Sequence, residues 1–306
     1  MTDSIAQPVH ALVRFGLNSP NAQRLAGFYE QAFGATVQLR ERQGEREFDQ
    51  WPAVQGGAAR TLLQLGDSTI EFLEMDYPGR TYPNQLSPYD TRFQHLGIVV
   101  TDMQRAMQRL GPIAGWTAIS TEGPQTLPAS AGGVIAFKFR DPDGHPLELL
   151  QFATGKSPRH WTVKTGADLF RGIDHSAMSV RHIDRNVGFY QALGLRLSAR
   201  TLNQGLEQQR LDGVPNPLVD VIALAPLIPT PHVELLHYRT LYRPAPETLE
   251  VNDVAATRLI FSLNEDRGAQ QVRGKLLRDP DGHFIEVLTK AELQDTSTLS
   301  SMPSQP

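Results

Sequence analysis

The chain has 306 residues, enough for two domains of ordinary size, and 40% of them are hydrophobic, as in globular proteins with an extensive core. Its 29 basic and 33 acidic side chains give a net charge of -4, which argues against a nucleic-acid partner. The absence of cysteine excludes disulfides, thiolate metal ligands and a cysteine nucleophile. Because no signal peptide or membrane-length apolar run is recognisable, we expect a cytoplasmic protein without a membrane partner.

Four short apolar strands are predicted at intervals of about 80 residues, which indicates an internal repeat. Their first residues are Arg14, His95, His175 and Arg258. The phrase Gly-Phe-Tyr recurs at 27–29 and 188–190, and Asp-Pro-Asp-Gly-His recurs at 141–145 and 279–283. The chain therefore contains four modules, and its two halves are related by duplication.

Each complete module is predicted to contain a strand, a helix and then three strands. Helix starts are expected at Ser19-Pro20, Thr101-Asp102 and Asp184, and helix ends at Gly111 and Gly194. The repeated Asp-Pro-Asp-Gly phrases are predicted turns before each half's last strand. The fourth module is about half as long as the others, so we expect residues 264–272 to lack the helix and part of the hairpin. Residues 294–306, rich in Ser, Thr and Pro, are expected to be a disordered tail.

Matching inward positions on the first and last strands carry the side chains suited to a site. They are Arg14, His95, His175 and Arg258 on first strands, and Glu71, Glu148, Glu234 and Glu286 on last strands. A carboxylate on an apolar strand needs a cation or several hydrogen-bond donors when it is buried. Histidine and glutamate together suit a divalent metal, whereas arginine pairs with glutamate directly.

Other histidines near these glutamates do not share their strand face. Side chains alternate along a strand, so His145, His237 and His283, each three residues from a glutamate, point away from it. We interpret them as turn or outer-face residues. His232, two residues from Glu234, is retained as a weaker additional ligand.

Taken together, the four modules, the first-strand histidines, the last-strand glutamates and the Asp-Pro-Asp-Gly-His turns resemble the vicinal oxygen chelate superfamily, which includes glyoxalase I, extradiol dioxygenases and bleomycin-resistance proteins. The resemblance implies an α+β fold of four βαβββ modules, the last one shortened, forming two half-open mixed β barrels flanked by helices. We predict a first domain over 9–153, with modules 9–75 and 92–153. The second spans 172–290, with modules 172–238 and 254–290.

Two pairings of the modules are open. If one pairs with two and three with four, each barrel holds an arginine, a histidine and two glutamates. If two pairs with three and one with four, the residues segregate, and we favour this crossed pairing. One site then contains His95, Glu148, His175 and Glu234 as metal ligands. The other, a degenerate metal-free site, contains Arg14, Glu71, Arg258 and Glu286 in a pair of salt bridges.

By resemblance, the leading expectation is a glyoxalase I-like lyase or isomerase that acts on a carbonyl or enediolate substrate. It would use Ni, Zn, Co, Mn or Fe(II), with Glu148 or Glu234 as the catalytic base. The second reading is an extradiol-type dioxygenase with Fe(II). The usual ligand positions of that family correspond here to His175, Arg258 and Glu286, and the arginine replaces a histidine ligand. Fe(II) would instead need His95, His175 and one glutamate. The third is a non-catalytic binding protein. All three take a small molecule, whose contact residues the sequence does not reveal, and homo-oligomerisation stays open.

Overall fold

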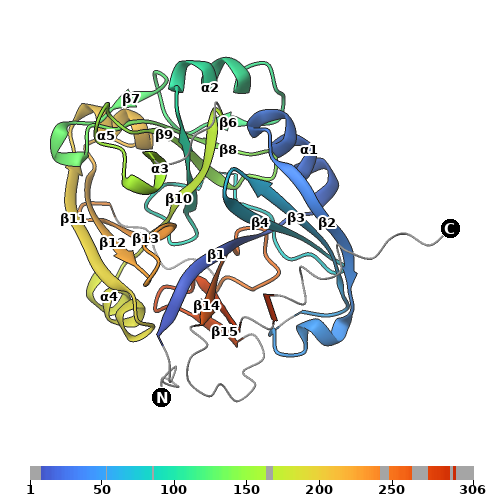
Figure 1. Cartoon of the computed structure of the whole chain (residues 1–306). Coiled ribbons are helices and arrows are strands. Elements are labelled where there is room, and N and C mark those ends of the chain that lie inside the picture. Colours follow the sequence, from blue (N-terminus) through green and yellow to red (C-terminus); the bar gives the residue numbers. More distant parts are fainter. Residues whose placement is uncertain are drawn as a thin grey trace.

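The computed structural model describes residues 8–52, 54–84, 86–162, 168–241, 248–263, 275–289 and 292–293. These residues form an α+β fold of two mixed sheets with helices packed against them (Figure 1). The tail predicted over 294–306 and the shortened segment 264–272 lie outside the described residues. In the described part of the chain, no helix has the length and apolarity needed to cross a membrane.

The strands and helices of modules one and three follow the predicted order of strand, helix and three strands, whereas module two has four strands after its helix. Module one contains β1 (Val9–Asn18), α1 (Ala22–Phe33), β2 (Thr36–Gln43), the short η1 (Glu45–Phe48), β3 (Ala58–Leu65) and β4 (Ser68–Met75). Module two contains β5 (Gln94–Val100), α2 (Met103–Leu110), β6 (Thr117–Ala118), β7 (Gln125–Thr126), η2 (Ala129–Ala131), β8 (Ile135–Arg140) and β9 (Pro146–Gln151).

The second half of the chain repeats this arrangement with one addition. After the linker helix α3 (Arg159–Thr162), module three contains β10 (Phe170–Ser179), α4 (Ile183–Ala192), β11 (Arg196–Gln204), α5 (Leu206–Asp212), β12 (Leu218–Ala225) and β13 (His232–Tyr238). Module four contributes β14 (Arg258–Leu263), β15 (Lys275–Arg278) and β16 (Phe284–Leu288). Helix α5, inserted between β11 and β12, was not predicted.

The helix starts agree with the sequence to within a few residues. Asp102 caps α2 as predicted, because its carboxylate accepts a hydrogen bond from the Arg105 backbone N–H at 3.0 Å. Helix α1 begins later than predicted: its N-cap is Asn21, and the Ser19 hydroxyl instead donates to Asp143 at 2.5 Å. Asp184 lies in the first turn of α4 rather than at its cap.

Strand pairing joins the modules in the crossed arrangement. One sheet has the order β15-β16-β14-β1-β4-β3-β2 and combines modules one and four; we call it sheet A. The other has the order β11-β12-β13-β10-β5-β9-β8-β6, with β7 on β8, and combines modules three and two; we call it sheet B. The predicted division into 9–153 and 172–290 thus describes the sequence repeat, and the sheets do not follow it. The arginines and histidines are separated as the favoured pairing predicted: the first-strand arginines lie in sheet A and the first-strand histidines in sheet B.

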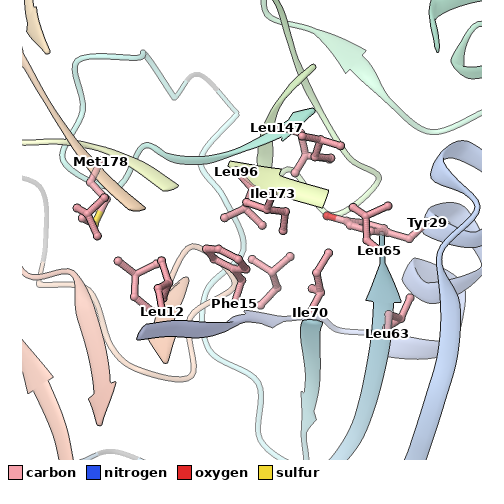
Figure 2. Close-up of a cluster of buried hydrophobic side chains, with 14 of the residues drawn as sticks. Leu12, Phe15, Tyr29, Leu63, Leu65, Ile70, Leu96, Leu147, Ile173 and Met178 are labelled. Carbon is pink, nitrogen blue, oxygen red and sulfur yellow. The ribbon is translucent and has the colours of Figure 1, made fainter. Parts of the chain in front are cut away.

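The main apolar core lies between the two sheets. Alternation along β1 places Phe15 and Leu17 in this core, while Arg14 and Gly16 face the opposite side of sheet A. Figure 2 shows side chains from β1, β3 and β4 facing those from β5, β9 and β10, including Leu96 and Ile173. Because these faces are mostly apolar and shared, the charged faces of both sheets point away from each other, each toward its own site.

The two Asp-Pro-Asp-Gly-His turns join different modules. The Asp141 carboxylate accepts hydrogen bonds from the Tyr29 hydroxyl at 3.1 Å and from the His145 ring Nδ1 at 2.9 Å. His145 is 1% exposed, and its Nε2 lies 3.0 Å from the backbone oxygen of Asn18. His145 therefore lies in the turn, as predicted, but it is buried and not on an outer face, because the turn packs against helix α1 of module one.

The turn of module four repeats this arrangement against module three. His283 is 2% exposed, which corrects the same outer-face prediction, and its Nδ1 lies 2.8 Å from Asp279. The Tyr190 hydroxyl donates to Asp279 at 3.2 Å, just as Tyr29 does to Asp141. The recurrence of Gly-Phe-Tyr and Asp-Pro-Asp-Gly-His in the sequence thus reflects one repeated contact between modules.

Replacing Asp281 with alanine is expected to destabilise the fold by about 1–2 kcal/mol, the usual cost of a lost helix cap. Its carboxylate accepts hydrogen bonds from the Arg181 backbone N–H at 2.8 Å and the Asn186 side chain at 2.7 Å, at the start of α4. Urea unfolding measures the change. Glu30→Ala, on the exposed face of α1, is the control and should leave the midpoint unchanged; equal midpoints for both variants would contradict the capping role.

Candidate metal site

Four strands of sheet B bring the predicted ligands onto one face. Each opening strand runs parallel to the last strand of its own module, β5 beside β9 and β10 beside β13, and β5 runs antiparallel to β10. Gly97 lies opposite both Glu148 and His175, and Ala177 lies opposite both His95 and Glu234. This register makes all four side chains neighbours at the junction of modules two and three.

Three of the four predicted ligands converge closely. The Glu148 Oε2 atom lies 3.1 Å from His95 Nε2 and 3.4 Å from His175 Nε2. Donor atoms of these three residues all lie within 4.8 Å of one another. Glu234 is more distant: its Oε2 is 3.8 Å from His175 Nε2, and its side chain is 23% exposed against 10% for Glu148.

Gly97 provides the space that the His175 ring occupies. A Cβ atom built at this position would lie 2.6 Å from His175 Nε2, closer than real Cβ contacts allow. The neighbouring strand therefore needs glycine here for the imidazole to lie flat across it toward Glu148. Gly16 has the equivalent relationship to Arg258 in sheet A.

Asp174 is a site residue that the sequence reasoning missed. A register shift in β10 between Ile173 and His175 breaks the strict alternation, so Asp174 lines the same cavity as His175. Its Oδ2 lies 3.2 Å from His175 Nδ1, and its Oδ1 accepts a hydrogen bond from the Trp161 indole at 2.7 Å. Asp174 therefore holds the His175 ring with Nε2 directed toward Glu148.

His232, the predicted weaker ligand, lies on the same side of the site. Its Nε2 is 3.5 Å from Glu234 Oε1, and its Nδ1 is 3.9 Å from Asp174 Oδ2. Donor atoms of Asp174, His175 and His232 form a second group within 4.8 Å of one another. His232 thus connects the two carboxylates that flank His175.

Lys138 is a second residue that the sequence reasoning did not select. It lies directly opposite Glu148 in the β8–β9 register and is 4% exposed. Its Nζ donates to Asp212 at 2.8 Å, and the other oxygen of Asp212 accepts hydrogen bonds from Gln208 at 2.7 Å and Tyr238 at 2.9 Å. A single lysine between Phe137 and Phe139 in an apolar strand was the available signal.

The two histidines have opposite electrostatic environments. Burial and the positive charge of Lys138 lower the pKa of His95, so its ring is neutral at neutral pH, as a metal ligand must be. For His175, burial opposes the charged form, but Glu234 and the hydrogen bond to Asp174 outweigh it and hold the pKa well above its usual range. Before a metal binds, His175 is therefore the cation of the cluster.

The carboxylates stay ionised despite their burial. Burial opposes the charge of Glu148, but Lys138 and the two histidine rings hold its pKa well below the usual range. The pKa of Glu234 is also lowered, because His175 outweighs the effect of burial. Two carboxylates and two imidazoles therefore present a negative set of nitrogen and oxygen donors, which suits Zn, Ni, Co, Mn or Fe(II).

The arrangement of these donor atoms is also suitable for a metal ion. His175 Nε2 is buried and makes no hydrogen bond of good geometry, and its distances of 3.4 Å to Glu148 and 3.8 Å to Glu234 are long for an ion pair. An ion between these three groups would satisfy them better than these contacts do. The set opens into a cavity of about 250 Å³ whose walls include residues of β5, β8, β9, β10, β11, β12, β13 and α5.

The corresponding place in sheet A contains arginines, as predicted, but not in the predicted pairs. Arg14, Arg60 and Arg258 all donate to Glu71, at 3.1, 2.8 and 2.9 Å. Arg258 therefore reaches the glutamate of module one, because Gly16 lies opposite both Arg258 and Glu71. Arg60 was not selected from the sequence.

Glu286 also belongs to this second cluster, but the salt bridge predicted for it is not present among the described residues. Burial, which the nearby arginines only partly offset, raises its pKa to about 7. It borders a cavity of about 550 Å³ together with Arg14, Arg60 and Glu71. Guanidinium groups occupy the ligand positions here, and neither potential metal-binding group found among the described residues lies in this cluster.

Comparisons with known proteins agree with this architecture. Residues 10–149 match the family model described as Glyoxalase/Bleomycin resistance protein/Dioxygenase superfamily. No curated protein matches the sequence. Glyoxalase I from Zea mays is similar in structure, with a TM-score of 0.59 and 16% identity over 96% of this chain and 97% of that one. A Bacillus subtilis subsp. subtilis str. 168 protein titled "putative dioxygenase" has a TM-score of 0.56 and 13% identity, over 98% and 93% of the two chains.

The two sheets and the repeated modules have the fold of glyoxalase I, the fold of the vicinal oxygen chelate superfamily. Residues 10–149 are similar to the Glyoxalase/Bleomycin resistance protein/Dioxygenase superfamily, whose model matches them. The structural similarity to these two proteins covers nearly the whole chain and shows the fold. Because the identities are below 20%, the similarity does not assign a reaction.

Proposed function

We propose that the protein is a metal-dependent vicinal oxygen chelate enzyme that moves a proton on the carbon next to a carbonyl group, as a lyase or isomerase. The metal ligands would be His95, Glu148, His175 and Glu234, with Ni, Zn, Co, Mn or Fe(II) as the ion. The observation that carries the proposal is the convergence of two imidazoles on Glu148, with the buried His175 Nε2 making no hydrogen bond of good geometry.

The two glutamates differ in the roles that their surroundings favour. A divalent ion at this site would supply Lewis-acid polarisation of the substrate oxygens. Glu148 is held by both histidines and by the charge of Lys138, so it suits a fixed ligand. Glu234 is more exposed and lies outside the group formed by His95, Glu148 and His175, so it is the better candidate to take up and return a proton.

Deuterium exchange tests this reaction directly. The metal-loaded protein is incubated in D₂O with α-hydroxyacetophenone, a neutral α-hydroxyketone, and loss of the α-proton signal is followed by NMR. We expect exchange by the unaltered protein, and loss of about 100-fold or more in Glu234→Gln, the lower end of the range for general-base catalysis. Glu207→Gln, an exposed glutamate of α5, is the matched control. Equal rates in both variants would exclude Glu234 as the base.

A ring-cleaving dioxygenase is the second candidate. The three residues whose donor atoms lie closest together, His95, Glu148 and His175, are the ligand set of non-haem Fe(II) oxygenases. Oxygen uptake by the Fe(II)-loaded protein with catechol would favour it. Metal binding without either reaction would favour a binding protein of the bleomycin-resistance kind. For all three we keep the expectation of a cytoplasmic protein with a small-molecule partner.

Asp174→Asn is expected to weaken metal binding by about tenfold to 100-fold, the usual effect of removing a group that orients a ligand. The amide would no longer favour the ring orientation that Asp174 fixes through His175 Nδ1. Titration with Co(II) at pH 8 measures the affinity. Asp220→Asn, at the β12–β13 hairpin and paired with Arg239, provides the control; an Asp174 variant as tight as this control would contradict the positioning role.

Metal affinity is expected to rise with pH through the neutral range. The pKa of His175 is raised in the metal-free protein, so binding must displace a proton until the pH exceeds that value. Calorimetry in buffers of different ionisation enthalpy counts the released proton. Binding at pH 7 with no proton release would show that His175 is already neutral.

A further inference from the structure

The wall of the sheet B cavity is mostly apolar, and its charges are already paired. Residues of β11, β12 and β13 contribute the apolar Ala199, Val219, Val221, Ala223 and Leu236 to the lining, together with the polar Thr201, Asn203 and Tyr238. Among the described lining residues, Lys138 is the only lysine and there is no arginine. Since Lys138 donates to Asp212, it offers no free cation to a ligand carboxylate.

The charge balance also disfavours an anionic ligand. Glu148, Asp174 and Glu234 line the cavity, and Asp212 lies directly behind Lys138. These four carboxylates outnumber the combined charge of one lysine and one divalent ion. A ligand that carries carboxylates would therefore lose hydration without gaining an ion pair inside the cavity.

The size of the cavity sets a further limit. Its volume is about 250 Å³, whereas an engineered cavity of roughly 150 Å³ binds benzene and drug-sized ligands need roughly 300 Å³ or more. One substituted ring or a chain of similar bulk therefore fits inside. A glutathione adduct, which is a charged tripeptide with a group attached to sulfur, is too large to lie wholly inside this cavity.

Gln208 adds a directional group to this apolar wall. It is 3% exposed and lines the cavity from α5, the helix inserted between β11 and β12 (Figure 1). Its Nε2 donates to Asp212, which accepts only, so the orientation of the amide is fixed. Its Oε1 is buried without a hydrogen-bond partner. An acceptor left in this state calls for an O–H or N–H donor from a ligand.

We infer that the substrate is a neutral, largely apolar molecule of about one substituted ring. It has two adjacent oxygens at the metal end and an O–H or N–H group that donates to Gln208 Oε1. The inference rests on the proposed function, because it takes the His95–Glu148–His175 group as the metal end. It narrows that function by favouring a neutral molecule of this size over glutathione adducts, most of which would lie outside the cavity.

Three probes with the same pair of adjacent hydroxyls separate charge from hydrogen bonding. The first is 3,4-dihydroxyphenylacetamide, which is neutral and has an N–H donor. The second is methyl 3,4-dihydroxyphenylacetate, which is neutral and lacks that donor. The third is 3,4-dihydroxyphenylacetate, which is charged. Affinities are measured by calorimetry on the Co(II)-loaded protein without oxygen. We expect the amide to bind about threefold to tenfold more tightly than the ester, the value of one hydrogen bond. The ester should bind at least tenfold more tightly than the carboxylate.

Gln208→Met keeps the length of the side chain and removes the acceptor. It is expected to abolish the difference between amide and ester and to leave the difference between ester and carboxylate. Gln191→Met, on the exposed side of α4, should preserve both. The probe comparison on the unaltered protein stands even if the Gln208 variant does not fold.

Each failure has its own signature. A carboxylate that binds as tightly as the ester overturns the neutral substrate, and a Gln208 variant that still distinguishes amide from ester overturns its role. Cobalt bound at the site with no affinity for any probe also overturns the inference. If the protein retains no cobalt, or retains it equally after His95→Ala, the proposed function fails instead.

Discussion

Replacing His175 with alanine is expected to abolish stoichiometric binding of a divalent metal. His175 stands between both carboxylates, with Nε2 at 3.4 Å from Glu148 and 3.8 Å from Glu234, so its removal takes away the donor that faces both carboxylates. Removing a group behind a ligand costs about tenfold to 100-fold in affinity, and removing the ligand itself should cost more. His95→Ala should have a similar effect, because it removes the second imidazole on Glu148.

Metal content after dialysis, measured by mass spectrometry, checks this result. His237→Ala is the matched control, since His237 lies on the same strand as Glu234 but pairs with Asp220 at 3.5 Å, away from the site. His145 would be a poor control, because it is buried in a contact between modules. Full metal content in both His95→Ala and His175→Ala would exclude this site.

Replacing Glu71 with alanine is expected to destabilise the protein by about 3–5 kcal/mol, the cost of leaving buried charges without their partner. Glu71 is the shared acceptor for Arg14, Arg60 and Arg258, and the side chains of all three arginines are at most 8% exposed. The pKa of Glu71 is lowered to about 2, as the three guanidinium groups outweigh the burial that opposes its charge. Its contribution is therefore complete above the unfolded pKa of about 4.3 and is lost as the pH falls toward 2.

Urea unfolding at pH 7 and at decreasing pH measures both effects. Glu41→Gln is the control within the same cluster: Glu41 pairs with Arg60 at 2.8 Å, but its side chain is 21% exposed, so a loss below about 1 kcal/mol is expected. A loss for Glu71→Ala no larger than for Glu41→Gln would mean that water or other groups compensate the arginines.

The sequence was sufficient to locate both clusters because their residues occupy repeated strand positions. Alternation and the repeat selected His95 and His175 on β5 and β10, and the segregation of arginine from histidine favoured the crossed pairing that the sheets show. Their roles as metal ligands stay a prediction. The repeat cannot reveal which glutamate each arginine contacts, since that depends on Gly16 lying between strands of different modules.

Residues outside the repeat were missed for physical reasons that differ. Asp174 precedes His175 directly, so strict alternation places it on the other face, and only the irregular register of β10 brings it into the cavity. Gln208 lies on α5, which interrupts a predicted hairpin. The burial of His145 was not predicted, because a turn that follows a strand is usually exposed, whereas here the end of β1 and the Tyr82 ring cover it.

The crossed pairing has a consequence for the order in which the protein forms as it is synthesised. The strands of sheet B all come from one continuous stretch, from β5 to β13, so the candidate site is complete once residue 238 has left the ribosome. Sheet A instead joins the two ends of the chain, and β1 waits for β14, which belongs to the last module to be made. Loss of length in module four therefore alters the late sheet, which contains the arginines, and leaves the early one intact.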